Sequence, residues 1–196
     1  LKLLIIFAIS LIVLFAFKPW AQIGAGERGI VLNFGAVQNK VLNEGIHFRI
    51  PVMQEIIPMD VKIQKARTDA ASASSDLQDV ALSVALNYHI MPDKSNVVYQ
   101  TIGMEFKPRI IDPAIQEVMK AVSARYTAEE LITKRPAVSA EMQSALTARL
   151  LASNVAVDAF SIVSFSFSAK FTDAIEAKQT AEQNALKAKR DLDRIR

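Results

Sequence analysis

The sequence predicts an α+β fold with antiparallel sheets, one apolar segment before it and a long helix after it. Three observations support this prediction. Residues 80–90 alternate between large apolar side chains and small or polar ones, which is typical of a half-buried strand. Residues 108–125 and 136–150 repeat their apolar side chains with the period of an α-helix. Residues 171–196 combine many alanines with charges of both signs and lack glycine and proline, as a long solvated helix does.

The composition limits the class of protein. With 196 residues, 51% of them hydrophobic and 22% charged, the chain can build one large or two small packed domains. It contains no cysteine, which excludes disulfides, thiolate metal sites and a cysteine nucleophile. The net charge of +3 is small, and no basic stripe interleaved with aromatic residues is present, so we expect no nucleic acid as a partner.

The first element is an apolar segment, Leu3 to Phe17, which holds no charged residue. Lys18 and Trp20 follow it and suit the headgroup level of a bilayer, so we predict a single transmembrane helix within residues 1–22. Two alternatives are a cleaved signal peptide, with Gly24-Ala25-Gly26 as its cleavage site, and a buried core helix. Lys2 lies on one side of the segment and Lys18 and Arg28 on the other, so charge does not decide its orientation. The first residue is Leu and the last residues, 188–196, stop in the middle of a helical pattern, so we expect a longer natural chain.

Next comes "GAGERG", residues 24–29, which fits the G-x-G-x-x-G pattern of a dinucleotide-binding turn. Such a turn requires a strand before the glycines and a helix after them. Here the predicted order is reversed, because a predicted membrane helix precedes Gly24 and a strand-like run, residues 30–34, follows. We therefore interpret Gly24 and Gly26 as a flexible exit from the bilayer, and expect no cofactor.

Short strands punctuated by glycine and proline fill the predicted first module, residues 23–70. They read IVLNF, AVQNKVL, IHFRI and EIIPMDVKIQKA. Residues 70–75, AASASS, resemble a small polar linker. The predicted second module, residues 71–169, opens with the alternating strand 80–90.

Five further elements follow in that second module, and a long helix follows the module. A short helix is predicted for residues 94–102, ending at Gly103, and a longer one for 108–125. Thr127 and Glu130 form a capping-box sequence that opens a short helix ending near Arg135-Pro136, where the next amphipathic helix begins. Residues 155–167 return to strand character, and residues 170–196 begin a long helix or coiled coil.

A search for chemistry finds no catalytic, cofactor-binding or metal-binding residues. His47 and His89 both fall in predicted strands and lack partners at ligand spacing. The neighbouring carboxylates Asp76 and Asp79, or Glu129 and Glu130, form no convergent acid–base set, and Glu130 already has a capping role. We therefore expect no enzyme.

The order and spacing of several motifs resemble the SPFH, or Band 7, superfamily. Its opening signature resembles Gly26 to Gly35, and its second signature resembles Glu44 to Pro51. Further similar stretches are DLQDVAL (76–82) with NYH (87–89), TAEELITKRP (127–136), and the entry to the family's long helix (171–183). Within the superfamily the chain is most similar to the prohibitins, with the bacterial protease-regulator pair next.

This resemblance implies an SPFH domain of two α+β modules between a membrane anchor and a coiled coil. It further implies that many copies of the chain, or of the chain and a paralogue, assemble into a ring or cage on a lipid bilayer. An FtsH-type AAA membrane protease is the implied partner. The implied location is a bacterial or mitochondrial inner membrane, with most of the chain on its non-cytoplasmic side.

Two other function classes stay open at the level of sequence. One is a hydrolase or regulator whose active site lies in a C-terminal region beyond Arg196. The other is a secreted binding module, if the apolar segment is removed after synthesis.

Overall fold

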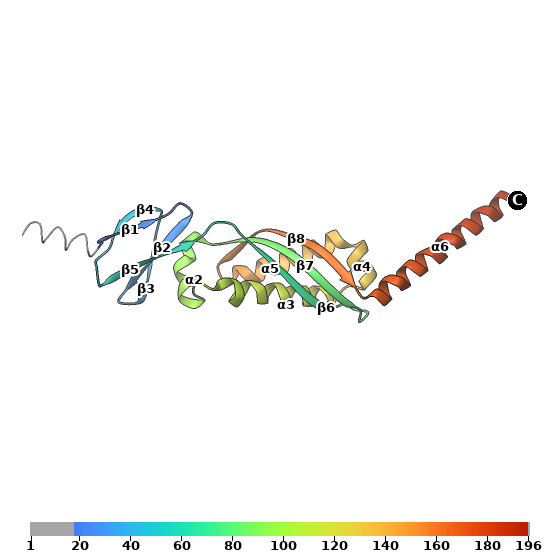
Figure 1. Ribbon diagram of the computed structural model, residues 1–196, viewed down its shortest axis with the longest axis horizontal. Helices are drawn as coiled ribbons and strands as arrows, with labels where there is room; N and C mark the ends of the chain where they lie inside the picture. Colours follow the sequence, from blue (N-terminus) through green and yellow to red (C-terminus); the bar gives the residue numbers. More distant parts are fainter. Residues whose placement is uncertain (1–17, 196) are drawn as a thin grey trace, which may run out of the picture. The chain divides into compact units, whose positions relative to one another are not determined.

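The computed structural model of the protein describes residues 18–195 (Figure 1). Its α+β composition and antiparallel strand pairing confirm the predicted class of the domain. The chain divides into two compact units, each built from three stretches of sequence. The first unit comprises residues up to 66 with 86–115 and 144–160, and the second comprises 67–85, 116–143 and 161 onward. The predicted module boundaries at residues 22, 70 and 169 stay predictions.

Five short strands form the β part of the first unit: β1 (Trp20–Ile23), β2 (Glu27–Asn33), β3 (Ala36–Leu42), β4 (Gly45–Phe48) and β5 (Gln54–Asp60). They make one three-stranded sheet in the order β3-β2-β5 and one ribbon of β1 with β4. A small core of Ile23, Val31 and Leu42, with Ile56 against it, joins the ribbon to the sheet. β2 to β4 confirm three of the predicted strands, but the fourth, predicted as one strand over residues 55–66, is divided between β5 and a later strand that begins at Gln64.

Strand β1 and the turn after it correct our interpretation of Gly24 and Gly26 as a flexible exit. The turn is closed by hydrogen bonds from Glu27 N to Gly24 O at 3.1 Å and from Gly24 N to Glu27 Oε2 at 3.0 Å. Gly26 has φ +75°, and a Cβ there would lie 2.4 Å from the Lys62 side chain. The glycine is therefore required by a tight, packed turn.

The membrane anchor predicted within residues 1–22 is not tested over most of its length, because residues 1–17 lie outside the described part. Trp20 to Gln22, at its end, are in strand β1. Among residues 18–195, no helix combines the length and the apolar character needed to cross a membrane.

A second three-stranded sheet has the order β6-β7-β8, formed by β6 (Gln64–Ala73), β7 (Asp79–Ile90) and β8 (Val155–Phe167). The alternation predicted for β7 is confirmed, because Val80, Leu82, Val84, Leu86, Tyr88 and Ile90 are all buried. The linker predicted for residues 70–75 is wrong, since β6 continues to Ala73. Small side chains suit this strand because Ala66 and Ala70 are buried in it, so a run of alanine and serine here has the composition of a linker without being one.

The helices agree closely with their predicted positions: α2 (Ser95–Thr101), α3 (Asp112–Ser123), α4 (Ala128–Thr133), α5 (Arg135–Leu151) and α6 (Ala169–Ile195). Two single turns precede them, a 3-10 turn at Pro92–Lys94 and a π-turn at Lys107–Ile111. Gly103, with φ +89°, ends α2 by donating to Val98 O, as predicted. The apolar stripe predicted for residues 108–125 is buried throughout: Ile111, Ile115, Val118, Met119 and Val122.

Candidate interaction surface at the start of the C-terminal helix

The second unit changes from strand to helix within two residues, at the end of β8. Phe167 is the last residue of β8 and Ala169 the first of α6. Ser168 lies between them and caps the helix, because its Oγ accepts from Phe171 N at 3.3 Å and its carbonyl accepts from Thr172 Oγ1. A contact between the Phe167 and Phe171 rings places the first turn of α6 beside the end of β8.

An apolar groove of about 410 Å³ lies where these elements meet. Its aromatic side consists of Phe165 and Phe167 from β8 and Phe171 from α6. The Phe165 and Phe167 rings are stacked with centroids 6.5 Å apart, and Phe167 and Phe171 are tilted with centroids 5.3 Å apart. The remaining lining residues are Ile132, Arg135, Thr172, Ile175 and Glu176. A helix that begins in water needs no aromatic rings at its surface, yet three half-buried rings lie on one surface here.

Arg135, the first residue of α5, holds the β8 side of this groove in place. Its Nη2 donates to Ile162 O at 2.7 Å, and its guanidinium carbon lies 5.6 Å from the centre of the Phe165 ring. A cation over an aromatic face is attractive, and the hydrogen bond fixes the guanidinium in that position. Arg135 therefore orients Phe165 and also gives the groove a cationic edge.

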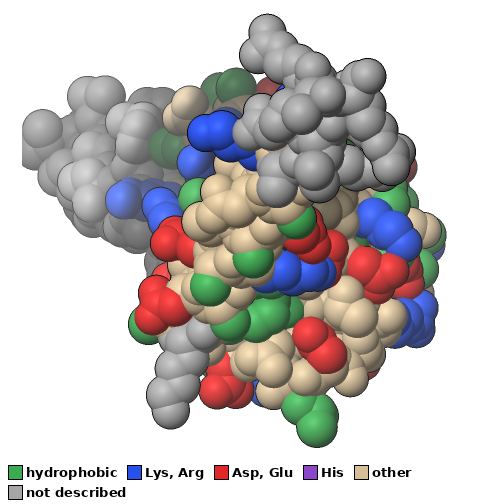
Figure 2. All heavy atoms as spheres, turned by 90° about the vertical axis from the view of Figure 1, so that its right-hand side faces the viewer, with side chains coloured by type: hydrophobic (Ala, Val, Ile, Leu, Met, Phe, Trp, Pro, Cys, Tyr) green, Lys and Arg blue, Asp and Glu red, His purple; other side chains and the backbone are tan. Residues whose placement is uncertain are grey.

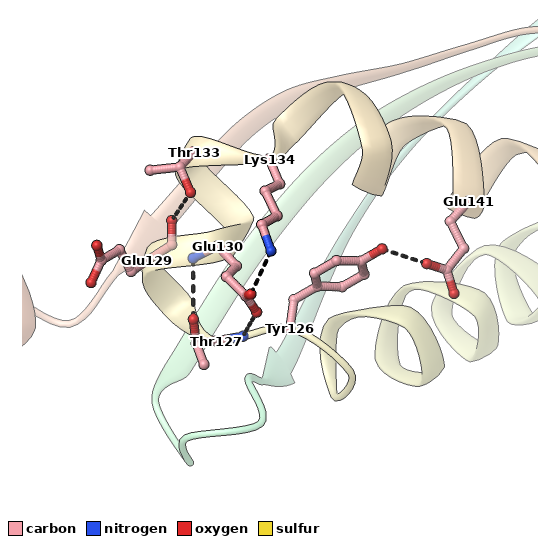
Figure 3. A network of polar contacts seen from close by, with 7 residues as sticks. All are labelled: Tyr126, Thr127, Glu129, Glu130, Thr133, Lys134 and Glu141. Carbon is pink, nitrogen blue, oxygen red and sulfur yellow. Dashed lines mark hydrogen bonds and ion pairs between the residues drawn. The ribbon is translucent and has the colours of Figure 1, made fainter.

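Helix α4 supplies Ile132, and the predicted capping box at its start is confirmed (Figure 3). Glu130 N donates to Thr127 Oγ1 at 3.2 Å, and Thr127 N donates to Glu130 Oε2 at 3.1 Å. Lys134 Nζ donates to the other Glu130 oxygen at 2.7 Å and, with the Thr127 amide, lowers the pKa of Glu130. Leu131 points inward and is fully buried, which leaves the adjacent Ile132 51% exposed toward the groove.

A hairpin between β6 and β7 adds a second cap to α4 that the sequence did not reveal. Asp76 Oδ1 accepts from Ala128 N at 3.0 Å and from the Ser74 hydroxyl at 2.6 Å. The Ser74 hydrogen bond is the main reason why the pKa of Asp76 lies below its ordinary value of 3.8, and the Ala128 amide lowers it further. Asp76 stands 52 residues before Ala128 in the chain, so no local pattern could identify this contact.

Replacing Asp76 tests this cap. Asp76→Ala should lower the free energy of unfolding by about 1 kcal/mol, because the Ala128 amide loses its partner. Since folding depresses the pKa of Asp76, its contribution is complete above the carboxyl's unfolded pKa and disappears as the pH falls through the folded value. Asp76→Asn keeps an acceptor, so it should retain most of the stability while losing this acid dependence. Urea unfolding from pH 7 to pH 2 measures both, with Asp79→Ala on the same hairpin as the control.

Tyr126 ties the segment before α4 to α5 (Figure 3). Its hydroxyl donates to Glu141 Oε2 at 2.6 Å, and Arg125 Nη1 donates to Glu141 Oε1 at 2.6 Å. The hydrogen bond raises the pKa of Tyr126 and lowers the pKa of Glu141. Both shifts stabilise a protonated tyrosine beside an ionised glutamate, which is the state of the pair at neutral pH. The arrangement therefore positions the segment before α4 against α5 and does not prepare an acid or a base.

Helix α6 extends the surface beyond the groove. A smaller depression of about 140 Å³ continues along Glu129, Ile132 and Thr133 of α4 and Ile175, Lys178 and Glu182 of α6. Lys178 Nζ lies 3.6 Å from Glu129 Oε2 across it. On the face drawn in Figure 2, acidic and basic side chains are interspersed with hydrophobic ones. Such a mixed surface suits another protein better than a polyanion.

The two histidines lie on different strands, whereas Asp76 caps the helix that carries Glu129 and Glu130. His47 lies on β4 with its Nε2 2.7 Å from Asn43 O, whereas His89 on β7 is paired with Asp158 at 2.8 Å. Within residues 18–195, no group of three or more His, Asp or Glu side chains is placed to hold a metal ion. The groove itself was missed, although Phe165, Phe167, Phe171 and Ile175 lie at strand and helix spacing on either side of Ser168.

Comparison with known proteins gives a consistent result. Residues 21–194 match the family model described as SPFH domain / Band 7 family. "Prohibitin-7, mitochondrial" of Arabidopsis thaliana is 38% identical over 86% of this chain and 61% of its own length. "Mitochondrial prohibitin complex protein 1" of Caenorhabditis elegans and "Prohibitin 1" of Mus musculus are each 33% identical over 86% of this chain and 62% of their own length. The chain thus spans about three fifths of the length of these relatives.

Proposed function

Because the chain belongs to the SPFH domain / Band 7 family, we propose that it is a prohibitin-like scaffold, which is anchored in a membrane and assembles into a ring or cage. The groove at the start of α6 is the observation that carries this proposal. It places 51% exposed Ile132 beside three half-buried aromatic rings, and apolar patches of this kind mark contacts with other molecules. The occupant that we propose is a second copy of this chain or of a paralogue.

Helix α6 supports the same proposal. It has 27 residues, about 40 Å of helix, and every residue from Glu176 to Arg190 whose burial is described is exposed. A solvated helix of this kind gains little stability alone and more from packing beside another helix. Leu186, 55% exposed, is available for that packing. Parallel α6 helices and occupied grooves would make each copy contact its neighbours twice, which strengthens weak contacts through effective concentration.

The similar proteins, and the resemblance of the sequence motifs to the family, suggest a more detailed function. One relative is named as part of a mitochondrial prohibitin complex, which favours an assembly at a mitochondrial or bacterial inner membrane. Proteins of this family are generally scaffolds rather than enzymes. Control of an FtsH-type AAA protease held within the ring is the activity that we propose from this resemblance.

Removing α6 tests the assembly. Deleting residues 171–196, together with any helix that follows in the natural chain, should leave small species that still sediment with membranes. The reason is that both the Phe171 side of the groove and the helix–helix contacts are lost. Size-exclusion chromatography with light scattering in mild detergent, after carbonate extraction of the membranes, measures both properties. A full-size ring from the truncated chain would show that α6 is not needed for assembly.

A further inference from the structure

Within residues 18–195, the two three-stranded sheets have four edge strands, and three of these strands are protected. Strand β3 is covered by α2, whose Asn96 Nδ2 donates to Gln38 O at 3.2 Å. Strand β5 contains Pro58, which has no N–H to offer to a further strand. On β8, the carbonyl of Ile162 already accepts from Arg135 Nη2 at 2.7 Å. An open edge invites pairing with another chain, so protection of this kind is expected.

Strand β6 is the fourth edge, and among the described strands it has a neighbour on one side only. At the hairpin that joins it to β7, Ser74 N donates to Gln78 O at 3.0 Å. Because bonding alternates along an antiparallel strand, the even-numbered residues of β6 direct their backbone groups toward β7. The odd-numbered residues therefore present their N–H and C=O groups to the open edge, and all five of them are exposed: Lys65, Arg67, Asp69, Ala71 and Ala73.

The charges along this edge complement a second copy of the same strand. Arg67 and Asp69 are two residues apart, so they have opposite charges on one face of the sheet. In an antiparallel pair of β6 strands centred on residue 68, Arg67 of each copy lies directly opposite Asp69 of the other. Lys65 then lies opposite Ala71, where it meets no charge. Opposite charges across such a pair stabilise it and like charges repel, so this edge fits a copy of itself.

The sheet face beside this edge has room for the arginine of a second copy. A depression of about 390 Å³ lies on it, and apart from Asp69 and Leu82 all of its lining residues are alanine or serine. The chain's own Arg67 is fixed on this face, because its Nε donates to Ser83 Oγ at 3.3 Å. Arg67 of a second copy would reach Asp69 at the rim of the depression without meeting a large side chain.

We propose that β6 pairs with β6 of a second copy and joins two three-stranded sheets into one of six strands, an inference that rests on the ring assembly in the proposed function. Such a contact is two-fold, because residue 67 meets residue 69 in both directions. Neighbours within a ring of more than two copies are related by a smaller rotation, so a two-fold contact joins copies from different rings. The β6 edge therefore gathers rings into clusters on the membrane.

The 196 residues contain no cysteine, so introduced cysteines can report this pairing. Full-length chains carrying Lys65→Cys or Ala71→Cys, with any cysteine beyond residue 196 replaced by serine, are assembled into rings separately. They are then reconstituted together in vesicles of phosphatidylcholine and phosphatidylglycerol. Positions 65 and 71 lie opposite each other in the proposed pair, with Cα atoms about 5.5 Å apart, a distance that a disulfide spans.

Ala73→Cys, used in place of Ala71→Cys, is the matched control. Ala73 is exposed on the same edge and faces the same side of the sheet, but it lies roughly 6.6 Å farther along the strand. Mild oxidation should form the mixed disulfide between positions 65 and 71 at least about tenfold faster than the one between positions 65 and 73, because only the first pair has a suitable Cα separation.

Charge reversal tests the pairing independently of the cysteine positions. Arg67→Asp in both cysteine chains places two carboxylates opposite each other and should lower the disulfide yield at least about fivefold, as should Asp69→Arg in both chains. The yield should return when one chain carries Arg67→Asp and the other carries Asp69→Arg, because opposite charges then face each other at both places. Mixing two chains would not restore a yield that was lost through misfolding.

Four outcomes would contradict these expectations. If full-size rings formed in the vesicles but the mixed disulfide was no faster than in the control, the β6 pairing would be wrong and the proposed function would stand. A chain that formed no large oligomer would overturn both. A yield that charge reversal left unchanged would exclude Arg67 and Asp69 as the cause of the pairing. A disulfide that formed only when the two variants were assembled together would place the contact within one ring and overturn the clustering.

Discussion

Phe167→Asp should disperse the assembled protein into small species while leaving the individual chain folded. Phe167 contacts both Phe165 and Phe171 and so lies at the centre of the groove. It is only half-buried, so the single chain tolerates the change, whereas a carboxylate enclosed by an occupant would lose its water without gaining a partner. A loss of about 2 kcal/mol at each lateral contact weakens that contact roughly thirtyfold, and a ring repeats the loss at every copy.

Native mass measurement in mild detergent reports the result, with Leu77→Asp as the matched control. Leu77 is an 86% exposed apolar residue of the same unit, outside the groove. Its φ of +59° also suits aspartate better than leucine, so the control should fold. If Phe167→Asp formed rings of unchanged size, the groove would not be part of the assembly contact. If Leu77→Asp dispersed the rings to the same extent, any added surface charge would be enough to disrupt assembly.

Leu131→Ala should be among the most destabilising single changes in the second unit, at about 2–5 kcal/mol. Leu131 is completely buried, and its removal leaves a cavity beneath α4. The neighbouring change Ile132→Ala should alter the free energy of unfolding by less than about 0.5 kcal/mol, because Ile132 is half exposed. Both changes should reduce assembly. Leu131→Ala does so because less of the chain is folded, and Ile132→Ala because it removes part of the groove wall.

Chemical denaturation and ring size, measured on the same samples, separate the two effects. Ile132→Ala should keep the wild-type unfolding midpoint and still lower the fraction of full-size oligomer. The interpretation of the groove fails if Ile132→Ala assembles like wild type while Leu131→Ala, studied under conditions where it is folded, does not.

Much of the fold was predictable because many of its signals are local. Burial on one side of β7 follows from alternation, and the capping box of α4 follows from Thr127 and Glu130 alone. The errors came from residues whose local signal is weak or misleading. Ala70 to Ala73 are small enough for a linker but lie in β6, and Gly24 to Gly26 look flexible but form a tight turn closed by Glu27 and packed against Lys62.

The candidate surfaces were less predictable. Phe165 and Phe171 were assigned to the right strand and helix, but their approach depends on the Ser168 cap and on Arg135, which reaches β8 from another helix. Exposure of large apolar side chains at one end of the β part of the first unit depends on strand register. Phe34 lies in the β2–β3 turn, Phe48 ends β4 and Val52 lies in the β4–β5 turn, and only pairing of β1 with β4 and of β2 with β5 brings these segments to one end.

The sequence by itself determined the class of fold, nearly every helix and strand, the family signatures and the lack of a recognisable catalytic motif. These properties depend on periodicity, capping and short motifs, which act over a few residues. Tertiary structure alone decided which apolar side chains stay exposed and which distant groups meet, such as Asp76 with Ala128. The reason is physical: hydrophobicity says that a side chain gains by leaving water, but only the packed chain decides whether its own core can cover that side chain.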